Sequence, residues 1–254
     1  NSVIAVSQFG GKAFYCCKVA NDELGHFYLE DLKNSGVDNS LEGKVPEDGI
    51  TGKCLVMVTE DSERTMNTFL GITQNFSVQD LNEWAIKDSK YLFIEGYLVT
   101  SPNGKEAMVN AKKIAEAAGT KVALTFSDPA MVKYFKSGFD DVIGPSVDLL
   151  FANEEEAMLF TAKDTLAEAR EELKKAAKHF VITQGKNGAM IWDGDTFIDI
   201  EPYRTVAIDS NGAGDMFAGA FMYGITNGHS YASSGKLASM ASSKIVSQFG
   251  PRLK

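Results

Sequence analysis

Apolar and polar positions alternate regularly over the second half of the chain, and they predict strands and helices in turn. Short apolar runs have the length and the β-branched or aromatic content of buried strands at 91–98, 122–126, 147–152 and 179–183. Apolar side chains recur at helical spacing over 105–118, 131–139, 154–160 and 164–178. Strands that alternate with helices in this way predict an α/β fold with a parallel sheet covered on both faces.

The first half of the chain is less regular. Segment 1–9 fits either a helix or a strand, segment 13–19 is typical of a buried strand, and a helix then ends at Lys33. Two strand-like runs follow at 51–59 and 64–70, separated by the turn 60–63. Both faces of the run 51–59 are apolar, so we expect at least one of its ends to be buried.

Composition limits the possible partners and the compartment. The chain has 254 residues, of which 44% are hydrophobic and 23% charged, as in ordinary soluble globular proteins. Its net charge of −9 argues against nucleic acid or an anionic membrane as a partner. Three cysteines without metal-ligand or disulfide spacing indicate a reducing, cytoplasmic location, and the apolar runs are too short to cross a membrane. Because the chain begins with Asn rather than Met, we expect an N-terminal portion to precede it.

The stretch 209–217, D-S-N-G-A-G-D-M-F, has the features of an anion pocket. It lies between a β-like run at 205–208 and a small-residue apolar helix over 218–225. Glycines let backbone N–H groups approach an oxyanion closely, and the start of a helix favours negative charge. Asp215 stands where a carboxylate can take a proton from an incoming hydroxyl. Asp and Asn also suit an ordinary helix start, so the residues alone leave both interpretations open.

Two further candidates follow predicted strands, where open parallel sheets bind their ligands. Asn153 and Glu156 have the spacing of a capping box, which is a purely structural device. Thr183 and Gly185 begin a glycine-containing loop that a simple hairpin would also use. No G-x-x-x-x-G-K-[ST] phosphate loop occurs, and 209–217 does not fit G-x-G-x-x-G because Phe217 occupies the third glycine position.

The stretch 209–217 resembles the C-terminal signature of the ribokinase-like (PfkB) carbohydrate and nucleoside kinases, usually D-T-x-G-A-G-D-x-F, with Ser210 in place of Thr. The likeness extends over 1–254 as a single domain. It implies a three-layer α/β sandwich with a mostly parallel central sheet and a small β lid, part of which lies within about 38–70. It also implies an ATP-dependent kinase, monomeric or homodimeric, whose partners are ATP and a small-molecule alcohol.

The resemblance implies a catalytic role for the glycine-rich stretch. Asp215 is the base, and the backbone of the preceding residues stabilises charge on the phosphoryl oxygens and helps to bind the nucleotide; these residues are Asn211, Gly212, Ala213 and Gly214. Asp209 either orients this loop or helps to bind a monovalent cation such as K⁺.

Other family motifs imply nucleotide contacts. Asn153 and Glu156 match N-x-x-E, in which Glu156 acts through water on the Mg²⁺ that accompanies ATP. Thr183 and Gly185 match the T-x-G-x-x-G loop that contacts the nucleotide phosphates and ribose. Arg64 is not part of these motifs; it lies in the lid region and is a candidate for substrate binding, where it would neutralise phosphate charge in the closed state, and it is otherwise a solvated charge at a strand end.

Acceptor binding is implied by the start of the chain. Asn1 matches the last residue of a Gly-Gly-x-x-x-Asn segment that binds the sugar, and it is otherwise a helix cap. In the turn 20–25 the family pattern G-x-D-x-x-G has Ala20 in place of the first glycine.

Within the family, several segments are similar to adenosine kinases, and these are E-R-T-M-N-T at 63–68, I-E-G-Y-L-V-T at 94–100, L-T-F-S-D-P-A at 124–130 and F-A-N-E at 151–154. Tyr97 would line the nucleoside pocket, although a strand tyrosine also suits a core. The implied reaction transfers the γ-phosphoryl group of ATP to the 5′-hydroxyl of adenosine, giving AMP for purine salvage. A ribokinase, a fructokinase, another sugar kinase and a non-catalytic nucleotide-binding relative remain the alternatives.

Overall fold

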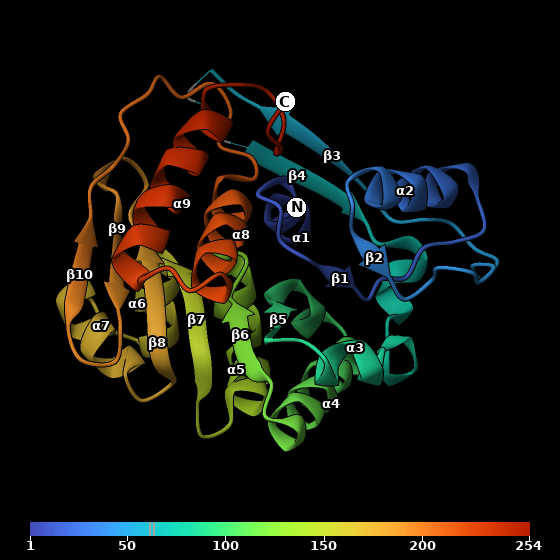
Figure 1. Ribbon diagram of the computed structural model, residues 1–254, viewed down its shortest axis with the longest axis horizontal. Helices are drawn as coiled ribbons and strands as arrows, with labels where there is room; N and C mark the ends of the chain where they lie inside the picture. Colours follow the sequence, from blue (N-terminus) through green and yellow to red (C-terminus); the bar gives the residue numbers. More distant parts are fainter. Residues whose placement is uncertain (61, 63) are drawn as a thin grey trace. The chain divides into compact units, whose positions relative to one another are not determined.

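A computed structural model describes residues 1–60, 62 and 64–254. Asp61 and Glu63, which the sequence places in the turn 60–63, lie outside the described residues, as does the first position of the segment 63–68. The chain divides into two compact units, the first formed by residues 1–76 and 201–254 and the second by residues 77–200 (Figure 1).

The second unit is built on a six-stranded sheet with the order β10-β9-β8-β7-β6-β5 (Figure 1). Its strands are β5 (Tyr91–Glu95), β6 (Lys121–Thr125), β7 (Val147–Asn153), β8 (Ala177–Thr183), β9 (Ala189–Trp192) and β10 (Phe197–Ile200). Strands β5 to β8 are parallel to one another, whereas β9 and β10 pair antiparallel. The prediction of a mostly parallel sheet is therefore confirmed.

The helices of the second unit are α3 (Glu83–Lys87), α4 (Pro102–Ala118), α5 (Pro129–Ile143), α6 (Glu154–Thr161) and α7 (Leu166–Leu173). Helix α4 packs against β5 and β6, and α6 packs against β7 and β8. In the core, the ring of Phe126 lies 5.0 Å from that of Phe139 and 4.7 Å from that of Phe160. Each fully buried aromatic side chain contributes about 1.5–3 kcal/mol of transfer free energy, so this cluster anchors the helices on the sheet.

Two predicted elements of the second unit end earlier than expected. The strand predicted over 91–98 stops at Glu95, and residues Gly96–Thr100 form a 3₁₀ turn. Gly96 lies so close to the next strand that a Cβ there would be 2.5 Å from the carbonyl oxygen of Thr125, which is why the chain turns at a glycine. The helix predicted over 164–178 covers only α7, because β8 already begins at Ala177.

The first unit contains helices, a short parallel strand pair and an antiparallel strand pair (Figure 1). Its elements are α1 (Ser2–Gln8), β1 (Phe14–Tyr15), α2 (Glu23–Asn34), β2 (Asp38–Asn39), β3 (Lys53–Val58), β4 (Arg64–Phe69), α8 (Ala213–Thr226) and α9 (Tyr231–Val246). Helices α8 and α9 lie side by side, and α1 packs on α8. Among the residues described, no helix is both long and apolar enough to cross a membrane.

Helix α2 begins where the turn 20–25 predicts. Its N-cap Asp22 accepts hydrogen bonds from the hydroxyl and the N–H of Thr51 and from the N–H of Gly25. The hydrogen bond from the Thr51 hydroxyl, followed by the backbone bonds, lowers the pKa of the Asp22 carboxyl. A Cβ on Gly25 would be 1.9 Å from the carbonyl oxygen of Ala20, so this position requires glycine.

Three predictions for the first unit were wrong or only partly right. Segment 13–19 forms only the two-residue strand β1, which is half-buried. Segment 205–208, predicted as β-like, is not a strand, and Val206 within it is 80% exposed. In place of strand pairing, the N–H groups of Ile208 and Asp209 donate to the carbonyl of Val246. In the run 51–59 the first residue, Thr51, is buried as expected, but β3 itself is exposed or half-buried.

Candidate active site

Helix α8 begins in a turn that only glycine can form. Its N-cap Gly212 has φ +78°, in the left-handed region that disfavours residues with a Cβ. A Cβ at this position would also lie 2.4 Å from Cβ of Pro251 and 2.7 Å from its Cα. The C-terminal segment therefore packs directly on the backbone of the glycine-rich stretch.

The backbone amides of this turn fall into two groups. The N–H of Asn211 donates to Asp209 Oδ1 at 2.8 Å, and the N–H of Ala213 donates to the carbonyl of Ser210 at 3.3 Å. These two amides are engaged within the protein. The N–H groups that find no acceptor among the described residues are those of Gly212, Gly214 and Asp215. Open amides at the start of a 14-residue helix form a site for a negatively charged group.

Gly214 provides open space beside these amides. A Cβ there would meet no atom within 4 Å, and its φ lies outside the left-handed region. We expect Gly214→Ala to leave the melting temperature unchanged or raised, because alanine favours the helix by up to about 1 kcal/mol. The added methyl group would occupy the space of an incoming phosphate, so kcat/KM for ATP should fall. Unchanged kinetics in a coupled ADP-release assay would contradict a phosphate position at Gly214.

The carboxylate of Asp215, in the first turn of α8, is half-buried and held by two donors from α1. Asn1 Nδ2 lies 2.8 Å from Oδ2, and Ser2 Oγ lies 3.4 Å from Oδ1. Asn1 occupies the N-cap position of α1, but its side chain makes no capping hydrogen bond. The structure thus brings Asn1, predicted to bind the acceptor, into contact with the predicted base.

The carboxylate of Asp209 is hydrogen-bonded to two backbone amides. Its side chain is buried at 3% exposure, and its two oxygens accept from the N–H of Asn211 at 2.8 Å and of Gly250 at 3.0 Å. Of the two roles expected for Asp209, these hydrogen bonds support the loop-orienting one. A role in binding K⁺ stays a prediction.

Arg64, at the start of β4, contacts the same loop. Its Nη1 donates to the carbonyl of Ser210 at 3.4 Å, and the side chain is half-buried. Ser62 adds two more contacts, since its carbonyl accepts from the N–H of Ser210 and its hydroxyl donates to the carbonyl of Ala207. Arg64 is therefore more than a solvated charge at a strand end, whereas neutralisation of phosphate charge remains a prediction.

In the second unit, Asn153 and Glu156 form a complete capping box between β7 and α6. Asn153 Oδ1 accepts from the N–H of Glu156 at 2.8 Å, and Glu156 Oε2 accepts from the N–H of Asn153 at 2.9 Å. Glu156 is buried at 4% exposure. Glu156 Oε1 also accepts from Asn153 Nδ2 at 3.1 Å, so both carboxylate oxygens take part in the capping box.

Thr183 and Gly185 lie beside this capping box. Asn153 and Thr183 are direct partners in the parallel pair of β7 and β8, so both strands end at the same edge of the sheet. Gln184 Nε2 donates to Glu154 Oε1 at 3.2 Å and ties the loop to the first turn of α6. Gly185 has φ +53°, and a Cβ there would meet nothing within 4 Å. The structure therefore brings the four predicted nucleotide contacts of this unit together at the carboxyl edge of the sheet.

Tyr97 is at the same edge of the sheet, in the 3₁₀ turn after β5. It is 42% exposed, so it is not a core residue, and its hydroxyl donates to the carbonyl of Ser127 at 3.3 Å. Ser127 itself has φ +70° and accepts from the N–H of Gly96.

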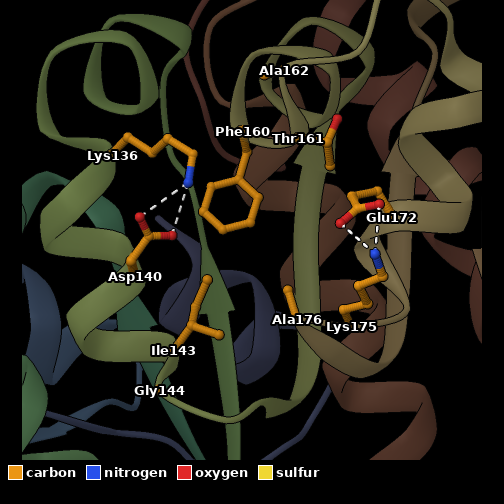
Figure 2. Close-up of a pocket in the computed structure, with 10 residues that line it drawn as sticks. All are labelled: Lys136, Asp140, Ile143, Gly144, Phe160, Thr161, Ala162, Glu172, Lys175 and Ala176. Atoms are coloured by element: carbon orange, nitrogen blue, oxygen red, sulfur yellow. Dashed lines mark hydrogen bonds and ion pairs between the residues drawn. The ribbon is translucent and has the colours of Figure 1, made fainter.

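A cavity of about 310 Å³ lies among α5, α6 and α7 (Figure 2). Its rim carries the ion pairs Lys136–Asp140 at 2.9 Å and Lys175–Glu172 at 2.8 Å. The cavity adjoins the segments that precede β7 and β8, at the opposite edge of the sheet from Asn153, and none of the predicted site residues lines it. We therefore do not assign the active site to this cavity.

Several contacts of the candidate site were not predicted from the sequence. Ser2 follows Asn1 directly, but nothing in its neighbours indicates a contact with a residue more than 200 positions away. Pro251 and Gly250 are in a loop, and their pairing with Gly212 and Asp209 depends on tertiary packing. A polar residue next to a predicted substrate ligand is the only signal that would have indicated Ser2.

Known proteins with similar sequences and structures place the chain in a family. The model of the pfkB family carbohydrate kinases matches residues 1–254. A solved structure of adenosine kinase from Sinorhizobium meliloti is 33% identical with a TM-score of 0.94, and the match covers 100% of this chain and 78% of that chain. Adenosine kinase from Saccharomyces cerevisiae is 28% identical over 95% of this chain and 74% of the relative. A 5-dehydro-2-deoxygluconokinase from Clostridium perfringens is 28% identical over 90% and 71%.

The chain belongs to the pfkB family of carbohydrate kinases, and its fold is the ribokinase-like α/β fold. It is an ATP-dependent kinase whose acceptor is an alcohol group.

Proposed function

We propose that the acceptor is adenosine and that the γ-phosphoryl group of ATP is transferred to its 5′-hydroxyl, giving AMP in purine salvage. The observation that carries this choice is Tyr97, an exposed aromatic side chain at the carboxyl edge of the sheet, where its ring would offer a flat surface to a purine base. Relatives that are adenosine kinases support the proposal.

The residues of the first unit suit this transfer. As the acceptor oxygen attacks phosphorus, its proton passes to the carboxylate of Asp215. The open N–H groups of Gly212 and Gly214 stabilise the charge on the phosphoryl oxygens. Asn1, which touches Asp215, is placed to bind a hydroxyl of the acceptor. We propose these residues as the catalytic group of the protein.

The residues of the second unit can be tested for whether they suit the binding of Mg²⁺. Within the part of the chain that the structure describes, no group of three or more His, Cys, Asp or Glu side chains could hold a metal ion. Mg²⁺ commonly uses one or two carboxylates together with substrate phosphates, and Glu156 acting through water fits this mode. When bound, Mg²⁺ would neutralise charge on the phosphates. A solved structure from E. coli with this fold, 22% identical, contains ATP and Mg²⁺.

A sugar acceptor is the second candidate. The relative from Clostridium perfringens is a 5-dehydro-2-deoxygluconokinase, and its identity to this chain equals that of the yeast adenosine kinase. Asn1 and Asp215 would bind a sugar hydroxyl in the same way as a ribose hydroxyl, so these two residues do not distinguish the candidates.

The acceptor can be identified by measuring ADP release with adenosine, inosine, guanosine, ribose, fructose and 5-dehydro-2-deoxygluconate. We expect kcat/KM for adenosine to exceed that for ribose by roughly 10- to 100-fold, the contribution of one stacked base. 5′-Deoxyadenosine, which lacks the accepting hydroxyl, should give no ADP above background. A higher kcat/KM for any of the sugars would overturn adenosine as the acceptor while leaving the kinase activity intact.

A further inference from the structure

The two donors that hold Asp215 differ in how firmly they are placed. Asn1, which donates to Oδ2, is exposed to solvent. Ser2, which donates to Oδ1, is only 6% exposed. One oxygen of the carboxylate thus has a donor that can exchange with an incoming ligand, and the other oxygen has a buried donor.

Close packing of α1 on α8 fixes the position of Ser2. Gly219 stands one helical turn after Asp215, and a Cβ on it would lie 2.6 Å from the carbonyl oxygen of Ser2 and 2.4 Å from Cβ of Ala5. The backbones of the two helices are therefore in direct contact beside the carboxylate. This contact determines the distance between the Ser2 hydroxyl and Asp215, and it leaves little freedom for adjustment.

We propose that Ser2 is a positioning residue for Asp215, which rests on the proposed role of Asp215 as the base. A carboxylate held only by the exposed amide of Asn1 can rotate about its χ2 angle, whose energy wells are broad. The hydrogen bond from Ser2 to Oδ1 fixes the plane of the carboxylate. When Asn1 turns to the acceptor, Oδ2 then faces the attacking hydroxyl and receives its proton, while Ser2 keeps its own proton throughout.

The test compares substitutions on one helix. Ser2→Ala removes the hydrogen bond to Asp215, whereas the control Ser7→Ala removes a hydroxyl on α1 that donates to the carbonyl of Ser35. We expect Ser2→Ala to lower kcat roughly threefold, because the contact of 3.4 Å is longer and therefore weaker than an ordinary hydrogen bond to a charged group. KM for ATP and the melting temperature should match those of Ser7→Ala. Ser2→Thr keeps a hydroxyl and should retain most of kcat.

Two results would overturn the proposal. One is a kcat for Ser2→Ala equal to that of Ser7→Ala, and the other is an equal loss of kcat in Ser2→Ala and Ser2→Thr, which would indicate packing rather than the hydroxyl. All variants are measured on the full chain with the acceptor that gives the highest turnover, so a wrong choice of adenosine does not affect the result. Asp215→Asn, measured in parallel, distinguishes a failure of the proposed base from a failure of the positioning role. If Asp215→Asn keeps full kcat, Asp215 is not the base. If Asp215→Asn loses kcat and Ser2→Ala does not, only the positioning role of Ser2 fails.

Discussion

Replacing Asp215 with Asn is expected to lower kcat by about 10²- to 10⁴-fold, the range that a positioned general base contributes. Asn keeps the size of the side chain, and its single carbonyl oxygen can still accept from Asn1 or from Ser2, but it cannot take the proton of the attacking alcohol. Coupled ADP release at saturating ATP and acceptor measures the loss. Protection by ATP and Mg²⁺ against thermal unfolding should stay close to that of the unmodified chain.

The control for this substitution is Glu23→Gln, which also removes a carboxylate from the first turn of a helix. Glu23 is exposed at the start of α2, so its loss should leave kcat unchanged. If Asp215→Asn turned over as fast as Glu23→Gln, Asp215 would not be the base.

Gly212→Ala is expected to be the most damaging substitution for stability in the glycine-rich stretch. It adds about 1–2 kcal/mol of left-handed backbone strain, and the overlap of the new Cβ with Pro251 adds about 1–3 kcal/mol. Chemical denaturation measures the sum as a fall in the free energy of unfolding. We expect activity to fall with it, because the turn that opens the amides would be displaced.

Gly228→Ala separates the two contributions. Gly228 follows the other end of α8, has φ +84°, and a Cβ there would meet nothing within 4 Å. It should therefore show the strain without the overlap. If the two variants lost the same free energy of unfolding, the packing of Pro251 on Gly212 would have no energetic consequence.

The regular part of the fold could be predicted because its signals are local. The strands that become β6, β7 and β8 are short apolar runs, and the helix predicted over 105–118 ends where Gly119 adopts φ +78°. Boundaries failed where a distant segment decides the conformation. The run 205–208 has β-forming residues, yet the N–H groups of its last residue, Ile208, and of Asp209 donate to the carbonyl of Val246 at the end of α9 rather than to a strand.

The candidate site was predictable where a motif is continuous in sequence. Asp215, Asn153 and Thr183 stand at helix starts and strand ends, as their motifs indicate. The supporting contacts of Ser2 and Pro251 come from the first and last segments of the chain, and no local pattern predicts them. Residue type and spacing thus indicate which residues are candidates for catalysis and binding. The residues that support them in the structure are brought there by tertiary packing, which no local pattern predicts.

The open space at Gly214 has an evolutionary consequence. A glycine codon becomes an alanine codon through one nucleotide change, and at this position the resulting chain should fold at least as well as before. Selection for a soluble, long-lived protein would not remove such a copy after a gene duplication. If Gly214→Ala weakens ATP binding as predicted above, a relative that still folds but uses ATP poorly is a single mutational step away from the enzyme.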